Sequence, residues 1–411
     1  MPTRKPSDVI VVGAGVVGAA CAYYAAQAGL SVTVVDRGSV AGGTTGAGEG
    51  NLLVSDKEPG PELELALLAN TLWRELADVL PPHVEYEAKG GLVVASGESG
   101  MRALRDFAAR QEKAGVTAQE VPGDRLHDLE PHLAPGLAGG FLYPQDSQVM
   151  PAHAAAQLLR AAGDRVRLCL GEEVTGLLTG GAGEIRGVRT AAGELHAPYV
   201  VNAAGTWGGA LAELAGVHLP VLPRRGFVLV TEPLPRVVRH KVYAADYVAD
   251  VASGSAALQT SAVVEGTPAG PVLIGASRER VGFDRTLSVE VLRRLAAGAT
   301  SLFPVLGTVR AMRTYPGFRP YLPDHLPAIG PDPRVHGLLH ACGHEGAGIG
   351  LAPVTGQIIA LCLTNGELPL DISPFRPDRF GTPEPAPAPD PGSAPDPGSA
   401  PDPGSAPDPA L

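Results

Sequence analysis

The feature that most constrains the fold is a glycine-rich turn near the start of the chain, in the stretch VIVVGAGVVGAA. The apolar residues before the turn predict a buried strand, and Val16–Ala28 predicts a helix. Gly13 permits a tight turn, Gly15 lets the backbone approach a pyrophosphate, and Gly18 lets helix and strand pack closely. The helix N-terminus offers free N–H groups and a partial positive charge to phosphates. The turn therefore predicts a dinucleotide site.

Asp36 follows the second predicted strand, Ser31–Val35, where a carboxylate can accept hydrogen bonds from a ribose. FAD and NAD share this fingerprint, but three later segments favour FAD. The Gly- and Thr-rich loop Gly42–Gly50 can wrap a long dinucleotide, and VVNAAGTWG (Val200–Gly208) ends a strand in small residues. The third segment, GHEGAGIGLAP (Gly343–Pro353), is a second glycine-rich turn.

The residues after this second turn predict a helix that starts near Pro353, runs through Leu363 and ends at Asn365 and Gly366. Its positive end would face the pyrimidine edge of the flavin. There it would stabilise negative charge on the reduced ring by about 3 kcal/mol, as in other preorganised sites.

Strand and helix patterns alternate elsewhere in the chain, which predicts a parallel α/β unit interrupted by β-rich insertions. Helical spacing occurs at Glu62–Leu80, Met101–Ala114, Ala152–Ala162 and Val289–Leu302. Strand patterns occur at Gly91–Ala95, Arg165–Leu170, Glu173–Leu178, Ile185–Thr190, Tyr199–Asn202, Gly226–Thr231 and Val272–Ala276. We therefore expect two domains, each built from discontinuous segments.

Composition excludes several other classes of protein. The net charge of −11 argues against a nucleic-acid-binding face, and no uninterrupted apolar run is long enough to span a bilayer. The four scattered cysteines form no CxxC pair, which favours a reducing cytoplasm, and the Ala-, Gly-, Arg- and Pro-rich composition is typical of a bacterial protein. Residues 382–411, with repeated PDPGSA, predict a disordered tail.

Four segments together resemble the D-amino acid oxidase superfamily of FAD enzymes, over nearly all of residues 8–375. They are the N-terminal glycine turn, NAAGTW, the GFRP motif (Gly317–Pro320) with PAIG after it, and the turn Gly343–Pro353. Within the superfamily, GTTGAGEGN and GHEGAGIGLAP are most similar to the flavin (beta) subunits of hydrogen cyanide synthase, opine oxidase and D-hydroxyproline dehydrogenase. The family usually carries Glu after the second strand, where this chain has Asp36.

The resemblance implies a mixed α/β fold in which a Rossmann-like FAD-binding domain is interleaved with an antiparallel-sheet substrate domain. Residues 8–85, 146–222 and 316–375 would form the FAD-binding domain. Residues 86–145 and 223–315 would form the substrate-binding domain.

The resemblance also implies the site. By its place in GFRP, Arg319 would clamp a substrate carboxylate, which suits a guanidinium fork. Arg224 and Arg225 are rivals for this role. Arg225, which with Gly226 resembles a family segment at the start of the substrate domain, is expected to have a structural role. The residues expected to bind the amine or gate entry are Tyr243, Tyr247, Tyr321 and His344, and for each tyrosine the alternative is a packing role in the core. The expected cofactor contacts are Gly13, Gly15, Val16, Val17, Gly18, Asp36, Arg37, Gly43, Thr44, Thr45, Gly50, Asn51, Leu52, Val174, Ala204, Gly205, Trp207, Arg319, Gly343, Glu345, Gly346, Ala347, Gly348 and Ile349.

We expect FAD to be bound non-covalently, because the loop Gly42–Gly50 has neither the His nor the Cys to which relatives attach flavin. His340, Cys342 and His344 form an H-x-C-x-H pattern on a strand-to-turn segment with no further ligand cluster, so no metal is expected.

The leading hypothesis is hydride transfer to FAD from the carbon that bears nitrogen in a small amino or imino acid, such as D-hydroxyproline, a D-amino acid, glycine or sarcosine. The resemblance implies a partner subunit with an iron–sulfur cluster or a second flavin as electron acceptor. The alternatives are an FAD-dependent 2-hydroxy acid dehydrogenase and a non-catalytic flavoprotein subunit of a larger complex.

Overall fold

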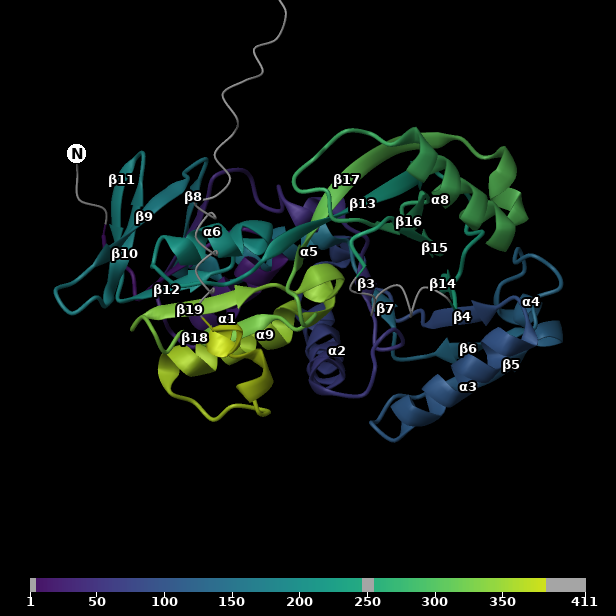
Figure 1. Ribbon diagram of the computed structural model, residues 1–411, viewed down its shortest axis with the longest axis horizontal. Coiled ribbons are helices and arrows are strands. Elements are labelled where there is room, and N and C mark those ends of the chain that lie inside the picture. Colours follow the sequence, from purple (N-terminus) through teal and green to yellow (C-terminus); the bar gives the residue numbers. More distant parts are fainter. Residues whose placement is uncertain (1–4, 246–254, 382–411) are drawn as a thin grey trace, which may run out of the picture.

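The computed structural model describes residues 5–245 and 255–381, in which two large sheets form the framework (Figure 1). The first sheet has the order β18-β19-β12-β1-β2-β8, with all neighbours parallel except β18 and β19. Its strands are β1 (Val9–Val12), β2 (Val32–Asp36), β8 (Val166–Leu170), β12 (Tyr199–Asn202), β18 (Ala328–Pro331) and β19 (Leu338–Cys342). The predicted Rossmann-like unit is confirmed.

Helices from distant parts of the chain cover the first sheet. Helix α1 packs against α5 and α9, and α9 packs against α2. The close approach of α1 and α9 requires a glycine, because a Cβ at Gly356 would lie 2.6 Å from the Ala20 carbonyl. These helices are α1 (Val16–Gln27), α2 (Pro61–Val79), α5 (Pro151–Ala161), α6 (Gly208–Glu213) and α9 (Gly348–Thr364).

The second sheet has the order β17-β13-β16-β15-β14-β4-β6-β5 and is antiparallel except for the parallel pair β14–β4. Its strands are β4 (Gly91–Ala95), β5 (Gln119–Pro122), β6 (Gly139–Tyr143), β13 (Leu222–Thr231), β14 (Lys241–Ala244), β15 (Gln259–Gly266), β16 (Val272–Arg278) and β17 (Ala311–Tyr321). Helix α8 (Val289–Leu302) packs on β13, β15 and β16, and α3 (Glu98–Glu112) packs on β4 and β6. A short helix, α4 (Leu126–Leu129), lies beside this sheet (Figure 1).

Two smaller sheets complete the fold. One contains β9 (Val174–Thr179), β10 (Ile185–Thr190) and β11 (Gly193–His196), and the other contains β3 (Asn51–Leu52) and β7 (Ser147–Gln148). The strands of the eight-stranded sheet fall within residues 91–143 and 222–321, so the last of them, β17, crosses the proposed domain boundary at residue 316.

Helix α9 differs from the expectation in where it starts. It begins at Gly348, so Pro353 lies inside the helix, and it ends at Asn365 in a left-handed conformation with φ of 54°. Residues 345–364 are long and apolar enough to cross a membrane by length and composition, but 61% of this stretch is buried inside the molecule. Because it packs on α1 and α2, α9 is a core helix here.

Candidate active site

The N-terminal turn has the geometry that its glycines predict. Gly13 has φ of +118°, and a Cβ there would lie 2.2 Å from the Ala203 carbonyl oxygen. A Cβ on Gly18 would lie 1.9 Å from the Gly13 carbonyl oxygen, so strand and helix could not keep their separation. Gly15 instead lines a cavity. The turn therefore brings bare backbone and the start of α1 to the wall of this cavity.

Asp36 and Thr45 hold the turn in place. The Asp36 carboxylate accepts hydrogen bonds from the backbone N–H groups of Ala14 and Gly38, both at 2.7 Å. The Thr45 hydroxyl accepts one from the Val16 N–H at 3.0 Å. A carboxylate oxygen can accept a further bond, so Asp36, which also lines the cavity, can both brace the turn and accept from a ribose hydroxyl.

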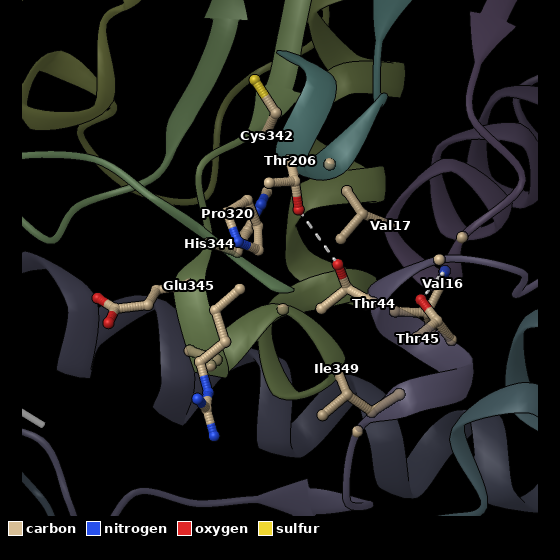
Figure 2. A pocket seen from close by; sticks show the side chains of 18 of the residues that line it. Val16, Val17, Thr44, Thr45, Thr206, Pro320, Cys342, His344, Glu345 and Ile349 are labelled. Carbon is tan, nitrogen blue, oxygen red and sulfur yellow. Dashed lines mark hydrogen bonds between the residues drawn. The ribbon is translucent and has the colours of Figure 1, made fainter. Parts of the chain in front are cut away.

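Two threonines join the nucleotide side of the cavity to the eight-stranded sheet. The hydroxyls of Thr44 and Thr206 both donate to the carbonyl of Phe318 in β17, at 2.6 and 2.9 Å. The two hydroxyls also lie 3.4 Å apart, as the dashed line in Figure 2 shows. Residues more than 270 positions apart thus meet at one wall.

A cation–π pair borders the cavity beside Asp36. The Arg37 guanidinium carbon lies 4.0 Å from the centre of the Trp207 ring, and Arg37 also forms an ion pair with Glu173 at 3.3 Å. Trp207 stacks on Phe283 with ring centres 5.2 Å apart. This aromatic and cationic surface is suited to stacking against a planar ring.

The cavity has a volume of about 950 Å³ and gathers most of the predicted cofactor residues. Those that line it are Gly13, Gly15, Val16, Val17, Asp36, Arg37, Gly43, Thr44, Thr45, Asn51, Leu52, Val174, Ala204, Gly205, Trp207, Arg319, Glu345, Gly346, Ala347, Gly348 and Ile349. Gly18, Gly50 and Gly343 lie behind its surface, where a Cβ would strike other atoms.

Arg319 lines the cavity between the two halves of the site. It donates from Nη1 to the Ser277 carbonyl at 2.8 Å, and a Cβ on Gly226 would lie 2.3 Å from that nitrogen. Its Cδ and Nε lie 3.6 Å from the Cβ position of Gly346, in the turn just before α9. The arginine of the eight-stranded sheet therefore contacts the second glycine-rich turn.

The rival arginines are engaged elsewhere. Arg224 is 1% exposed and pairs with Glu345 and, at 2.9 Å, with Gln259. Arg225 pairs with Glu279 and Asp284 at 2.8 and 2.6 Å. Neither lines the cavity.

Glu345 is a fixed anion at the cavity wall. His325 also contacts its carboxylate, at 3.0 Å. Burial alone would raise the pKa of Glu345, but the hydrogen bond with His325 and the Arg224 charge outweigh it, so the pKa is lowered. Figure 2 shows Glu345 and Ile349 at the wall of the pocket.

The start of α9 needs an outside donor because of Pro353. Proline has no N–H, so the carbonyl of Ile349, four residues earlier, lacks its usual helical partner. The buried Trp73 indole donates to this carbonyl at 3.1 Å and to that of Gly350 at 3.0 Å. Trp73 in α2 thereby holds the helix start that faces the cavity.

His344 lines the cavity in a neutral form. It is 3% exposed, and burial lowers its pKa to about 3. The Thr355 hydroxyl donates to the Leu351 carbonyl, so His344 Nε2, 3.0 Å from that hydroxyl, carries the proton and donates. Nδ1 is then an acceptor, and the ring ties the turn to α9.

Of the predicted tyrosines, none lines the cavity in the described part of the chain. Tyr243 is fully buried and bonds the Ser55 hydroxyl, which in turn bonds Asp146. Burial raises the pKa of Tyr243 well above its usual value. Tyr321 is buried beside His325, and Tyr247 lies outside the described residues.

The side chains of the H-x-C-x-H pattern are buried in the protein and contact other side chains. His340 is fully buried and lies 3.1 Å from both Asp332 and Asn202. Burial raises the pKa of the Cys342 thiol, which lines the cavity, to about 12, so it stays protonated. Within residues 5–245 and 255–381 no three His, Cys, Asp or Glu side chains are grouped to hold a metal ion.

Sequence reasoning missed several charged residues that line the cavity. They are Glu49, Asp56, Lys57, Glu58, Glu62, Glu172, Glu173, Arg278 and Arg285. Glu49 lies within the loop Gly42–Gly50, and the pattern GAGEGN contained the signal, since a lone carboxylate among glycines serves no packing purpose. Arg278 is the last residue of β16, Arg285 lies in the segment after it, and neither belongs to a motif.

The cavity fits FAD. It lies at the upper end of the usual range for small-molecule sites, about 300–1,000 Å³. The glycine turn, the bare N-terminus of α1 and Asp36 offer a pyrophosphate and ribose site, while the α9 turn and Arg319 face the same space.

Comparison with known proteins agrees with this geometry. The family described as DAO, FAD dependent oxidoreductase, matches residues 8–361. The chain is 32% identical to hydrogen cyanide synthase subunit HcnC of Pseudomonas aeruginosa over 93% of this chain and 98% of that protein. It superposes on the crystal structure of glycine oxidase from Geobacillus kaustophilus with a TM-score of 0.82 at 27% identity, covering 92% and 99% of the two chains. L-proline dehydrogenase from P. horikoshii, at 23% identity over 92% and 98%, shares the fold with a TM-score of 0.82.

Proposed function

Because the chain belongs to the DAO family of FAD-dependent oxidoreductases, we propose that it oxidises the C–N bond of a small amino or imino acid. The substrate class comprises compounds such as D-hydroxyproline, D-amino acids, glycine and sarcosine. Support comes from the names of two similar proteins, a glycine oxidase and a hydrogen cyanide synthase subunit.

One observation carries the proposal: Arg319 projects from the eight-stranded sheet against the turn that starts α9, inside the cavity that fits FAD. A guanidinium at this place can bind a carboxylate through two parallel hydrogen bonds. It would orient the substrate within the cavity, and such orientation is a large part of catalysis.

FAD, when bound, supplies the acceptor for the hydride of the substrate. The protein residues supply orientation and electrostatics. Arg319 would bind the carboxylate, and the N-terminus of α9 would stabilise negative charge on the bound cofactor. Neutral His344, with its proton on Nε2 toward Thr355, holds the turn, and Trp73 holds the helix start. Asp36 and the turn around Gly13 hold the nucleotide half.

The test is anaerobic addition of single compounds to the purified yellow protein, with flavin absorbance as the readout. The panel contains D- and L-amino acids, sarcosine, hydroxyproline and the matching 2-hydroxy acids. Bleaching by an amino or imino acid is expected. Bleaching by 2-hydroxy acids alone would replace the proposal with hydroxy acid oxidation, and no bleaching by any compound would indicate a non-catalytic flavoprotein subunit.

The electron acceptor in this proposal is a partner subunit that carries an iron–sulfur cluster or a second flavin. Support comes from the relative in Pseudomonas aeruginosa, which is named as a subunit. Readmission of air after bleaching tests this, because slow reoxidation is expected of a dehydrogenase and rapid reoxidation would contradict it. We place the enzyme in the cytoplasm, since its four cysteines are thiols.

A further inference from the structure

Glu49 is an ionisable side chain of the cavity that the mechanism above leaves without a role. It belongs to the loop that wraps the nucleotide side, lines the cavity, and is 9% exposed. Its Oε1 atom is buried and has no hydrogen-bond partner within the described residues. A carboxylate oxygen in this state is costly unless something binds there, so Glu49 needs an explanation.

The other oxygen of Glu49 has only weak partners. Oε2 accepts a hydrogen bond from Asn51 at 3.2 Å and lies 3.7 Å from the ammonium of Lys241. Lys241 lies closer to Glu265, at 3.2 Å, and also bonds Asn51. One ammonium thus serves two buried carboxylates, and the charge of Glu49 is only partly offset.

A glycine in the eight-stranded sheet makes room for the Glu49 carboxylate. A Cβ at Gly275 in β16 would lie 2.6 Å from Oε1, so any side chain there would displace the carboxylate. Gly226 in β13 does the same for the Arg319 guanidinium, whose Nη1 bonds the Ser277 carbonyl. Both charged groups are therefore seated on the same sheet by glycines.

The two seats are close to each other. Gly275 and Ser277 are two residues apart on β16, which corresponds to about 7 Å along a strand. An α-amino acid carries its carboxylate and its nitrogen on one carbon. Arg319 and Glu49 are separated by a distance of this order. One can therefore bind the carboxylate and the other the nitrogen of the same molecule, each through a hydrogen bond of about 3 Å.

We propose that Glu49 binds the cationic nitrogen of the substrate while Arg319 binds its carboxylate. The inference rests on the proposed function and deepens it, since Glu49 becomes the residue that selects amino and imino acids over 2-hydroxy acids. An ammonium gains more from a carboxylate than a hydroxyl does, because both can donate a hydrogen bond to it but only the ammonium adds the attraction between opposite charges. Because Oε1 is buried against Gly275, the carboxylate turns toward the cavity when the nitrogen binds, and Oε1 then acquires the partner that the protein itself does not supply.

The test uses two ligands that differ only at the nitrogen. 2-Aminoisobutyrate has no hydrogen on its α-carbon and so cannot lose hydride there, and isobutyrate is the same acid without the amine. Dissociation constants come from the perturbation of the flavin spectrum in the FAD-loaded protein. Wild type is expected to bind 2-aminoisobutyrate more tightly, and equal affinity for the two ligands would overturn the proposal.

Glu49→Gln is expected to weaken the binding of 2-aminoisobutyrate about 10- to 100-fold, which is the range of one charge-assisted hydrogen bond. The dissociation constant of isobutyrate should change by no more than about twofold. Glu49→Asp keeps a charge near Lys241 but withdraws it from the cavity, and is also expected to lose the preference for the amine. Glu265→Gln is the matched control, because Glu265 shares Lys241 with Glu49 but does not line the cavity. It should retain the preference.

If the role of Glu49 is structural, Glu49→Gln should weaken the binding of both ligands equally, or Glu265→Gln should also lose the preference for 2-aminoisobutyrate. Either result refutes the proposal. Its failure can be told apart from failure of the proposed function. If amino acids bleach the flavin in wild type and in Glu49→Gln with the same half-saturation, only the role of Glu49 is wrong. If none bleaches wild type, the proposed function is wrong.

Discussion

The contact between Trp73 and the start of α9 makes a quantitative prediction about stability. Trp73 is 1% exposed and donates to the carbonyl of Ile349, whose helical donor is missing because residue 353 is proline. In Trp73→Phe this buried carbonyl loses its partner, which costs about 1–3 kcal/mol. The smaller ring leaves a cavity worth on the order of 1–2 kcal/mol more. We expect unfolding to become easier by about 2–5 kcal/mol.

The double-mutant cycle with Pro353→Ala isolates the hydrogen bond. Alanine at position 353 has an N–H that can donate to Ile349, so the carbonyl no longer depends on the indole. The cost of Trp73→Phe should therefore be smaller in the Pro353→Ala background, by about 1–2 kcal/mol.

Urea unfolding followed by far-ultraviolet circular dichroism measures the cycle, since the substitution removes one of only two tryptophans. All four proteins are compared at the same saturating FAD concentration, because a bound ligand raises apparent stability. If the losses of unfolding free energy in the two single variants add up to the loss in the double variant within about 0.5 kcal/mol, the role given to Trp73 is refuted.

The other predictions concern the nucleotide turn and the buried histidine. Gly18→Ala places a methyl group 1.9 Å from the Gly13 carbonyl oxygen, so the protein should lose FAD on purification. Gly97→Ala is the control and should keep FAD, because no atom lies within 4 Å of a Cβ at that position. The ratio of flavin to protein absorbance measures both, and equal ratios would contradict the account of the turn. Because burial lowers the pKa of His344 from 6.5 to about 3, the unfolded chain takes up a proton there that the folded chain does not. The free energy of unfolding should fall from about pH 7 towards pH 4, and His344→Gln should lose this part of the fall; identical pH profiles would count against a neutral buried ring.

Local patterns were sufficient for several elements in different parts of the chain. Strand β10 and helix α8 have the predicted bounds, and α1 ends one residue before the prediction. These elements are regular apolar stretches between clear glycine or polar breaks, so the period of the pattern defines them.

The eight-stranded sheet was harder to predict because its strands contain residues that usually interrupt strands. β17 contains Pro316, Gly317 and Pro320, and β6 begins with two glycines. The glycines are there for close approach: a Cβ at Gly140 would lie 2.4 Å from the Val93 carbonyl, and one at Gly317 would lie 2.7 Å from that of Ala47. Such needs arise only from tertiary contacts.

In the candidate site, too, some residues were predictable from local motifs and others only from the folded structure. The glycines and Asp36 were predictable because one motif contains them all. Glu49 and Arg319 meet the cavity from opposite parts of the chain, and only the folded structure shows that Arg224 is occupied by Glu345. The division of the chain into an FAD-binding and a substrate-binding domain remains a proposal.

The central claim is that Arg319 holds the carboxylate of the substrate beside the flavin. The most direct measurement is anaerobic reduction of the flavin in Arg319→Met and wild type, as a function of the concentration of an amino acid that bleaches wild type. We predict the same FAD content in both proteins and a half-saturating concentration roughly 100-fold higher in Arg319→Met, as expected for loss of a bidentate ionic contact. An unchanged half-saturating concentration would contradict the claim.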